Sequence, residues 1–130
     1  MKRVLVIDDD PQIMIFIKFI LEKNNFEVFS ADSGMKGLEI LQNEDIDIVL
    51  LDVMMPGMDG YEVCRKIREN PKTKDKPVLM LTALGMGEDF EKALEVGANW
   101  YIVKPFKPQQ LIERINMLLE EKKGGENEGN

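Results

Sequence analysis

The chain has 130 residues, of which 44% are hydrophobic and 32% charged, so it has the length and composition of one ordinary globular domain. It has no histidine, which excludes a histidine kinase, a His-containing phosphotransfer protein, a Ser-His-Asp hydrolase and a His-ligated zinc enzyme. A net charge of −7 argues against nonspecific nucleic-acid binding, and a single cysteine cannot close an internal disulfide.

Five short apolar runs have the length of β-strands, and each contains β-branched or aromatic residues. In chain order they are Val4 to Ile7, Glu27 to Ser30, Ile48 to Leu51, Val78 to Leu81 and Trp100 to Val103. A stretch with helical periodicity follows each run. The apolar positions that mark these helices are Ile13, Ile17, Ile20 and Leu21, then Leu38 and Leu41, then Val63 and Ile67, then Phe90, Ala93 and Leu94, and finally Leu111, Ile115 and Leu118. Asp10 before Pro11 predicts the cap of the first helix, and the second should begin near Ser33.

Alternating strands and helices predict an α/β fold with a parallel sheet covered by helices on both faces. The expected form is a flavodoxin-like (βα)5 three-layer sandwich with strand order 2-1-3-4-5. We expect residues 1–120 to form this domain. Residues 121–130 contain no apolar side chain and are predicted to be a disordered polar tail.

No apolar run approaches the roughly 20 residues that cross a bilayer. The N-terminal apolar run ends at Asp8 after four residues, which is too short for a secretory signal. We therefore expect a cytoplasmic protein with no membrane partner.

Polar residues follow four of the five strands, at the edge where parallel sheets bind ligands. Asp8 and Asp9 follow the first, Asp52 the third, Thr82 the fourth and Lys104 the fifth. Taken singly, each could be a turn, a cap or a surface charge. Taken together, three converging carboxylates need a compensating cation, and Mg²⁺ prefers oxygen ligands of this kind.

The order of the acids suggests which of them is a nucleophile. A carboxylate can attack phosphorus to form an acyl phosphate, and Asp52 stands alone at the end of the most apolar strand. Asp8 and Asp9 are adjacent, so they are better suited than Asp52 to act together as a metal-binding pair. The hydroxyl of Thr82 and the ammonium of Lys104 are suited to hold phosphoryl oxygens.

Four segments together resemble the receiver domain of bacterial two-component response regulators, over about residues 1–120. They are Val-Leu-Val-Ile-Asp-Asp-Asp ending at Asp10, Leu-Leu-Asp-Val-Met-Met-Pro-Gly-Met-Asp-Gly ending at Gly60, Leu-Thr-Ala ending at Ala83 and Lys-Pro-Phe ending at Phe106. The resemblance implies a signalling protein of a phosphorelay rather than an enzyme, with a sensor histidine kinase or a His-containing phosphotransfer protein as phosphodonor.

Carried over residue by residue, the resemblance implies specific roles at the site. Asp52 matches the phosphoacceptor, Asp9 the direct ligand of Mg²⁺ and Asp8 a ligand through water. The carbonyl of Met54 matches the backbone ligand, and Thr82 and Lys104 match the residues that bind the phosphoryl group. The family often has a cis peptide before the residue that matches Pro105.

The resemblance also implies a switch. Tyr101 matches the aromatic that follows Thr82 on phosphorylation and so changes the surface of the fourth helix, fifth strand and fifth helix. Trp100 should point to the opposite face of the sheet. Met54 and Leu84 are apolar at positions that influence water access in the family, so we expect a comparatively long-lived phosphate.

The first helix is more apolar than one buried stripe requires. Its residues Ile13, Met14, Ile15, Phe16 and Ile17 fit either a core helix or a docking surface for the phosphodonor, which the resemblance places there.

Three other functions fit parts of the sequence. A haloacid-dehalogenase-type, Mg²⁺-dependent phosphatase would use the Asp8 to Asp10 spacing, but Asp52 would be unexplained and Gln12 departs from its pattern. A nucleotide-binding module would need phosphate donors where this chain has acids. The chain could also be a receiver fragment of a longer DNA-binding regulator, as opposed to a single-domain regulator.

Overall fold

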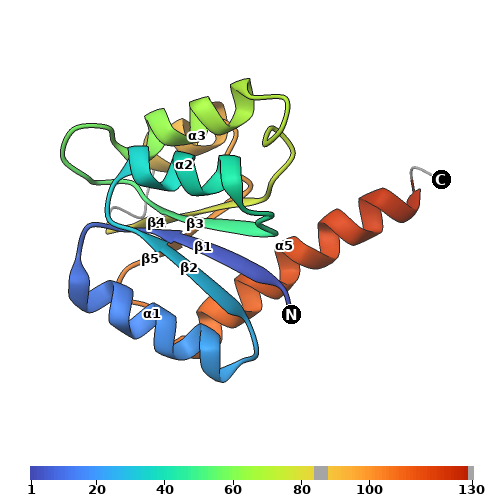
Figure 1. Ribbon diagram of the computed structural model, residues 1–130, viewed down its shortest axis with the longest axis horizontal. Coiled ribbons are helices and arrows are strands. Elements are labelled where there is room, and N and C mark those ends of the chain that lie inside the picture. The colour runs from blue at the N-terminus through green and yellow to red at the C-terminus, as the bar shows by residue number, and fades with distance from the viewer. Residues whose placement is uncertain (84–87, 129–130) are drawn as a thin grey trace.

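The computed structural model describes residues 1–83 and 88–128, with helices and strands alternating along the chain (Figure 1). The elements are β1 (Arg3–Ile7), α1 (Pro11–Lys23), β2 (Glu27–Ala31), α2 (Gly34–Asn43), β3 (Ile48–Asp52), α3 (Gly60–Glu69), β4 (Val78–Thr82), α4 (Glu88–Glu95), β5 (Trp100–Val103) and α5 (Pro108–Glu128). All neighbouring strands pair in parallel, in the order β2-β1-β3-β4-β5. The predicted flavodoxin-like fold is therefore confirmed.

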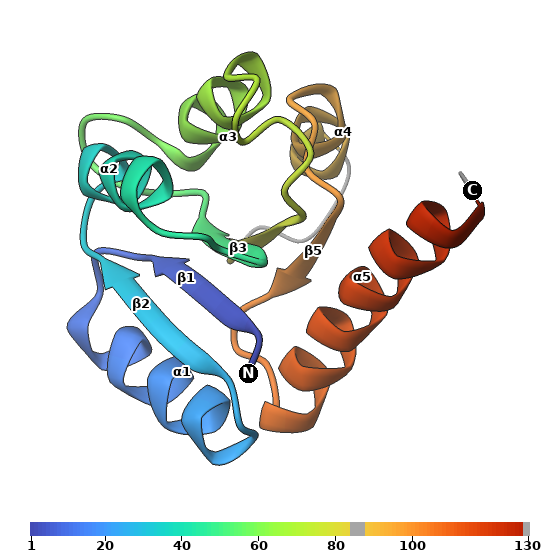
Figure 2. The same cartoon turned by 45° about the vertical axis from the view of Figure 1, so that its right-hand side comes forward.

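Helices cover both faces of the sheet, α2, α3 and α4 on one side and α1 and α5 on the other (Figure 2). Successive strand residues point to opposite faces, so Leu5 and Ile7 join the core under α2 and α3 while Val4 and Val6 join the core under α1 and α5. Strands β3 and β4 are buried along their whole length. This double burial explains why their sequences are nearly continuous apolar runs.

The predicted helix starts are confirmed by their caps. The side chain of Asp10 accepts a hydrogen bond of 2.9 Å from the backbone N–H of Gln12, and Pro11 occupies the first turn of α1. Ser33 caps α2 in the same way through the N–H of Lys36. These local bonds satisfy backbone donors that helix geometry leaves without partners, so they set where each helix begins.

The last helix extends beyond the predicted domain boundary at residue 120. Helix α5 runs to Glu128 and so includes residues 121–128 of the segment expected to be a disordered polar tail, and the domain boundary at residue 120 stays a prediction. Glu and Lys favour helices, and adding residues to an existing helix needs no new nucleation. Figure 1 shows the end of α5 projecting from the body of the domain.

The first helix separates into a buried and an exposed face. Ile17, predicted as part of a docking surface, is fully buried between α1 and the sheet, so that assignment is wrong for this residue. A helix turns about 100° per residue, and Ile17 lies on the same face as the buried Ile20 and Leu21. Across the described residues, no helix is both long and apolar enough to cross a membrane.

Candidate functional site

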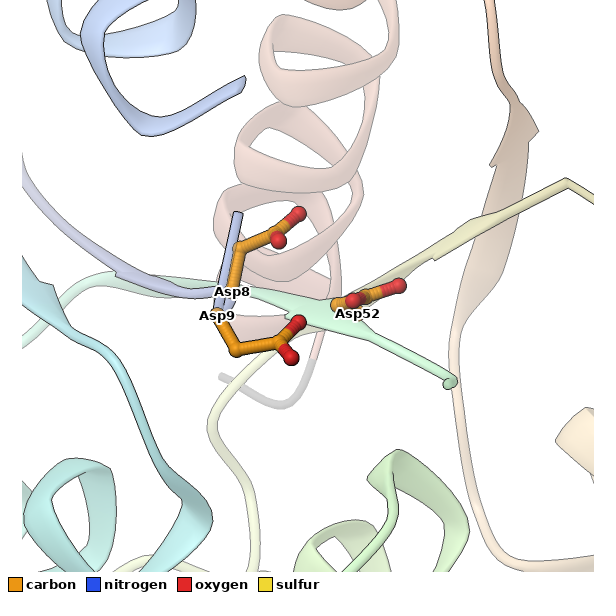
Figure 3. Close-up of side chains that lie close together, drawn as sticks. All are labelled: Asp8, Asp9 and Asp52. Atoms are coloured by element: carbon orange, nitrogen blue, oxygen red, sulfur yellow. The ribbon is translucent and has the colours of Figure 1, made fainter. Parts of the chain in front are cut away.

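The carboxyl ends of two neighbouring strands bring three carboxylates together. Asp8 and Asp9 follow β1, Asp52 ends β3, and the two strands pair side by side. Each of these residues offers a carboxylate oxygen that lies within 4.8 Å of the others. Figure 3 shows the three side chains close together where β1 and β3 end. The acidic cluster predicted from the strand ends is therefore present.

Lys104 places its ammonium between two of these carboxylates. Its Nζ lies 3.0 Å from Oδ2 of Asp8 and 3.1 Å from Oδ1 of Asp52, and all three side chains are largely buried. Burial alone would lower the pKa of Lys104, but the hydrogen bonds and negative charges of Asp8 and Asp52 outweigh it and raise the pKa. Lys104 is therefore a fixed cation of the site.

Backbone groups hold the two buried acids in place. The N–H of Asp10 donates to Oδ1 of Asp8 at 2.9 Å, which orients that carboxylate at the start of the connection to α1. On the other side of the site, α3 begins at Gly60 against the carbonyl of Asp52. A Cβ at Gly60 would lie only 2.3 Å from that oxygen, so only glycine allows this close approach.

The environment of Asp52 disfavours its ionised form. Burial and the charge of Asp8 raise its pKa from an ordinary value to about 6, while Lys104 and the backbone N–H of Met54 act in the opposite direction. A divalent cation would relieve this unfavourable charge. The ionisation of Asp52 thus depends on the positive charges around its carboxylate.

Thr82 and Lys104 lie beside one another at the ends of β4 and β5. Thr82 is buried, and its carbonyl accepts a hydrogen bond of 2.7 Å from the N–H of Lys104. The peptide bond between Lys104 and Pro105 is cis, as expected from the resemblance. The five charged or hydroxyl residues predicted from the strand ends therefore belong to one edge of the sheet. Leu84, which was expected to influence water access, lies outside the described residues.

The acidic cluster fits Mg²⁺ by its donor chemistry. Three carboxylates against one ammonium leave an excess of two negative charges, which one divalent cation balances. Hard divalent cations prefer carboxylate and carbonyl oxygens over nitrogen or sulfur ligands. A cavity of about 400 Å³ opens beside Asp8 and Asp9, with Ser30 and Lys36 also in its lining. The cavity therefore adjoins the two acidic residues that follow β1.

Tyr101 packs in an aromatic cluster that the sequence did not reveal. Its ring lies 4.7 Å from the ring of Phe90 in α4 and 5.4 Å from that of Trp100, measured between ring centroids. Tyr101 packs against the core under α3 and α4, and Trp100 packs against the core under α1 and α5. The ring of Trp100 also lies 5.7 Å from that of Phe90, so the two aromatic side chains do not point to fully separate faces of the sheet. The spacing of Phe90 marked it as a core residue of α4, but its contact with the strand depends on where α4 lies.

The exposed face of α1 differs from the predicted set. Ile15 is 70% exposed and Phe16 is also exposed, whereas Ile13 and Met14 are partly buried against the core. Phe19, which the prediction omitted, is 64% exposed. We define the apolar ridge of α1 as Ile15, Phe16 and Phe19. The ring of Phe16 lies 6.1 Å from that of Phe106, so the ridge adjoins the segment that carries Lys104.

Comparison with known sequences supports one family. Residues 4–116 match the family described as response regulator receiver domain. The chain is also 40% identical over 119 residues to the DNA-binding dual master transcriptional regulator RpaA of Synechocystis, a match that covers 92% of this chain and 49% of that protein. The chain spans about half the length of the curated relatives it matches.

Solved structures of receiver domains superimpose on more than nine-tenths of this chain. A CheY-like receiver domain protein from Methanospirillum hungatei has a TM-score of 0.89 at 33% identity, with 96% of this chain and 98% of the other covered. The receiver domain of the sensor histidine kinase PA1611 from Pseudomonas aeruginosa has a TM-score of 0.85 at 27% identity, with 92% and 98% covered. That structure is described as having a magnesium ion coordinated in its active site cleft.

Proposed function

Since the chain belongs to the response regulator receiver family, we propose that it accepts a phosphoryl group on Asp52 from a phosphohistidine of a partner protein. The partner is a sensor histidine kinase or a His-containing phosphotransfer protein, because this chain has no histidine of its own. Receiver domains are normally signalling modules rather than enzymes. The reactions of this chain would be limited to its own phosphorylation from a phosphodonor and its own slow dephosphorylation.

The observation that carries the proposal is the position of Lys104 between Asp8 and Asp52. The buried ammonium of Lys104 contacts both Asp8 and the proposed nucleophile Asp52. It is therefore placed to stabilise negative charge on the carboxylate of Asp52 and on a phosphoryl group bound to it. In the transfer, an oxygen of Asp52 attacks phosphorus, the P–N bond breaks and the imidazole leaves. Lys104 and the hydroxyl of Thr82 then bind phosphoryl oxygens, which is mainly positioning and charge neutralisation.

A magnesium ion would be held by Asp9 directly, by Asp8 through water, by Asp52 and by the carbonyl of Met54. When bound, it would neutralise the charge of the carboxylates and of the incoming phosphoryl group. The donor chemistry of the acidic cluster and the magnesium reported for a similar receiver support this assignment.

Phosphorylation would act on partners through Thr82 and Tyr101. Reversing a two-state equilibrium from 1:99 to 99:1 requires about 5.5 kcal/mol. Charge-assisted hydrogen bonds contribute roughly 1.5 to 3 kcal/mol each, so a few new bonds to the phosphoryl group suffice. Movement of Tyr101 would disturb its contact with Phe90 and thereby alter α4, β5 and the adjoining α5.

The phosphodonor would dock on the apolar ridge of α1. The ridge is exposed, and its neighbour Phe106 stands two residues after Lys104, so a bound partner would be next to the phosphorylation site. An exposed apolar surface of this kind is typical of a protein interface.

Two outputs fit the phosphorylated chain. It could act as a single-domain regulator that binds a target or relays phosphate. Alternatively, it could be the receiver part of a longer DNA-binding regulator, which is supported by its match to about half of a DNA-binding relative. In either case, the acidic domain itself is not expected to contact nucleic acid.

Incubation with Mg²⁺ and a small phosphodonor such as phosphoramidate tests the central claim. We expect intact-mass and peptide analysis to show one phosphoryl group, on Asp52, and none in an Asp52→Asn variant. Asp10→Asn is a matched control, because it removes a neighbouring acid while asparagine also caps helices well. Labelling of Asp52→Asn at the wild-type level, or rapid turnover of diverse phosphate esters, would refute the proposal.

A further inference from the structure

The exposed sulfur atoms of the described chain belong to methionines rather than to its cysteine. Cys64 is fully buried, and burial raises the pKa of its thiol, so little reactive thiolate forms. By contrast, Met54 is 64% exposed and Met35 is 66% exposed. Peroxide entering from solvent therefore meets these thioethers before it meets a thiol.

Met54 differs from Met35 in where it lies. Its backbone N–H bonds to the carboxylate of Asp52, two residues earlier, so its side chain begins beside the proposed phosphoacceptor and extends into solvent. Met35 lies in the first turn of α2. Met55, the neighbour of Met54, is buried in the core. Among the described residues, Met54 is thus an exposed thioether next to Asp52, and Met35 is exposed to a similar degree on a helix outside the acidic cluster.

We propose that Met54 is an oxidation site, and that its sulfoxide shortens the lifetime of the acyl phosphate on Asp52. This inference rests on the proposed function, because it requires Asp52 to carry the phosphoryl group. Oxidation of Met54 would make the receiver respond to a second signal, a two-electron oxidant of the peroxide class. This oxidant would act next to Asp52, the residue that carries the phosphoryl group.

The chemistry balances with hydrogen peroxide as the oxidant. A lone pair of the Met54 sulfur attacks one peroxide oxygen, the O–O bond breaks, and the departing hydroxide takes up the remaining proton to give water. The sulfur loses two electrons and the peroxide gains them, which leaves a sulfoxide on the protein. Methionine sulfoxide reductases restore the thioether.

The effect on hydrolysis follows from the change in polarity. A thioether is at most a weak hydrogen-bond acceptor, so the side chain of Met54 does little to hold water near the phosphoryl group. A sulfoxide oxygen is a strong acceptor and can orient a water molecule there. One added neutral hydrogen bond in the transition state corresponds to a rate increase of roughly twofold to tenfold.

The test compares phosphate loss before and after oxidation in three proteins: the wild type, Met54→Leu and Met35→Leu. Each protein is treated with hydrogen peroxide or left untreated, freed of peroxide with catalase, and phosphorylated with phosphoramidate and Mg²⁺. The donor is then removed, and intact mass follows the loss of the phosphoryl group. Peptide mass spectrometry measures sulfoxide at residues 54 and 35. Each variant is compared with its own untreated sample.

We expect oxidation to accelerate phosphate loss in the wild type and in Met35→Leu by roughly twofold to tenfold, and to leave the rate of Met54→Leu unchanged. Treatment with both classes of methionine sulfoxide reductase should restore the slow rate. The inference is overturned if Met54 resists peroxide that oxidises Met35, if the oxidised wild type keeps its untreated rate, or if oxidation accelerates Met54→Leu equally.

The proposed function and the inference about Met54 are refuted by different results. If untreated protein takes up no phosphoryl group, the proposed function is wrong, and the inference about Met54 falls with it. If Asp52 is labelled but its lifetime is independent of the oxidation state of Met54, only the inference is wrong.

Discussion

The Nζ atom of Lys104 lies 3.1 Å from Oδ1 of Asp52, although the two residues are 52 positions apart in the chain. The same ammonium contacts Asp8 at 3.0 Å. Neighbouring β1, β3, β4 and β5 end at one edge of the sheet, and this shared edge creates the contact. The site thus contains a cation of its own, which partly neutralises its carboxylates without a metal.

Replacing Lys104 with methionine should destabilise the metal-free protein. The change leaves Asp8 and Asp52 buried without their shared ammonium, at a cost of about 1 to 3 kcal/mol in the free energy of unfolding. Mg²⁺ should recover more stability in Lys104→Met than in the wild type, because it replaces the missing charge. Urea unfolding with and without Mg²⁺ measures both effects.

Lys36→Met is the matched control, because Lys36 forms an ion pair with Asp32 in which both side chains are about two-thirds exposed. Exposed pairs contribute little, so this variant should unfold within about 1 kcal/mol of the wild type. Equal losses in the two variants would show that the position of Lys104 in the site has no special importance.

Asp52→Asn should stabilise the metal-free protein at neutral pH. The pKa of Asp52 in the folded protein is about 6, above its ordinary value of 3.8, so the folded state favours the protonated form. Ionisation therefore destabilises the folded protein progressively as pH rises from about 4 through about 6. Asparagine cannot ionise, and we expect a gain of about 1 to 3 kcal/mol at pH 7.

The pH dependence distinguishes this cause from a general packing effect. The advantage of Asp52→Asn should shrink when metal-free urea unfolding is repeated at pH 5, and it should also shrink at pH 7 with Mg²⁺. An advantage of constant size from pH 5 to pH 7 would contradict the raised pKa of Asp52.

Gly60→Ala should disturb the site by displacing the end of β3. The new Cβ would lie 2.3 Å from the carbonyl oxygen of Asp52 and 2.9 Å from Cα of Val53, so α3 must move. We expect a loss of about 2 kcal/mol or more in stability, and slower phosphorylation by phosphoramidate.

Gly57→Ala provides the comparison for this variant. Gly57 has a φ of +76°, but a Cβ there would meet nothing within 4 Å. Its cost should be the backbone strain alone, about 1 kcal/mol. If the two variants lost the same stability, close packing of α3 on Asp52 would not be the reason for glycine at position 60.

Ile15→Asp should weaken phosphotransfer from a partner histidine kinase more than phosphorylation by phosphoramidate. Ile15 belongs to the apolar ridge of α1 and is largely exposed, so an aspartate there removes docking surface without entering the core. The quantity to measure is the ratio of the two rates, which we expect to fall about tenfold or more. Met35→Asp, at a similarly exposed position on α2, should leave the ratio near its wild-type value.

Local sequence patterns determined the elements of this protein. The apolar runs identified all five strands because a strand buried on both faces has few polar residues. Asp10 and Ser33 identified helix starts because a cap is a bond between residues close in sequence. The polar residues of the candidate site were also visible in the sequence, because each follows a strand and parallel strands end at one edge of the sheet.

Only the tertiary structure decided which apolar residues are exposed and which groups touch. Ile15 and Ile17 are the same residue type on one helix, yet the first faces solvent and the second the core, because the sheet covers only one side of α1. The contact of Phe90 with Tyr101 depends on the place of α4, and the contact of Lys104 with Asp8 and Asp52 joins the ends of β5, β1 and β3. Such contacts join residues far apart in sequence, so no local pattern encodes them.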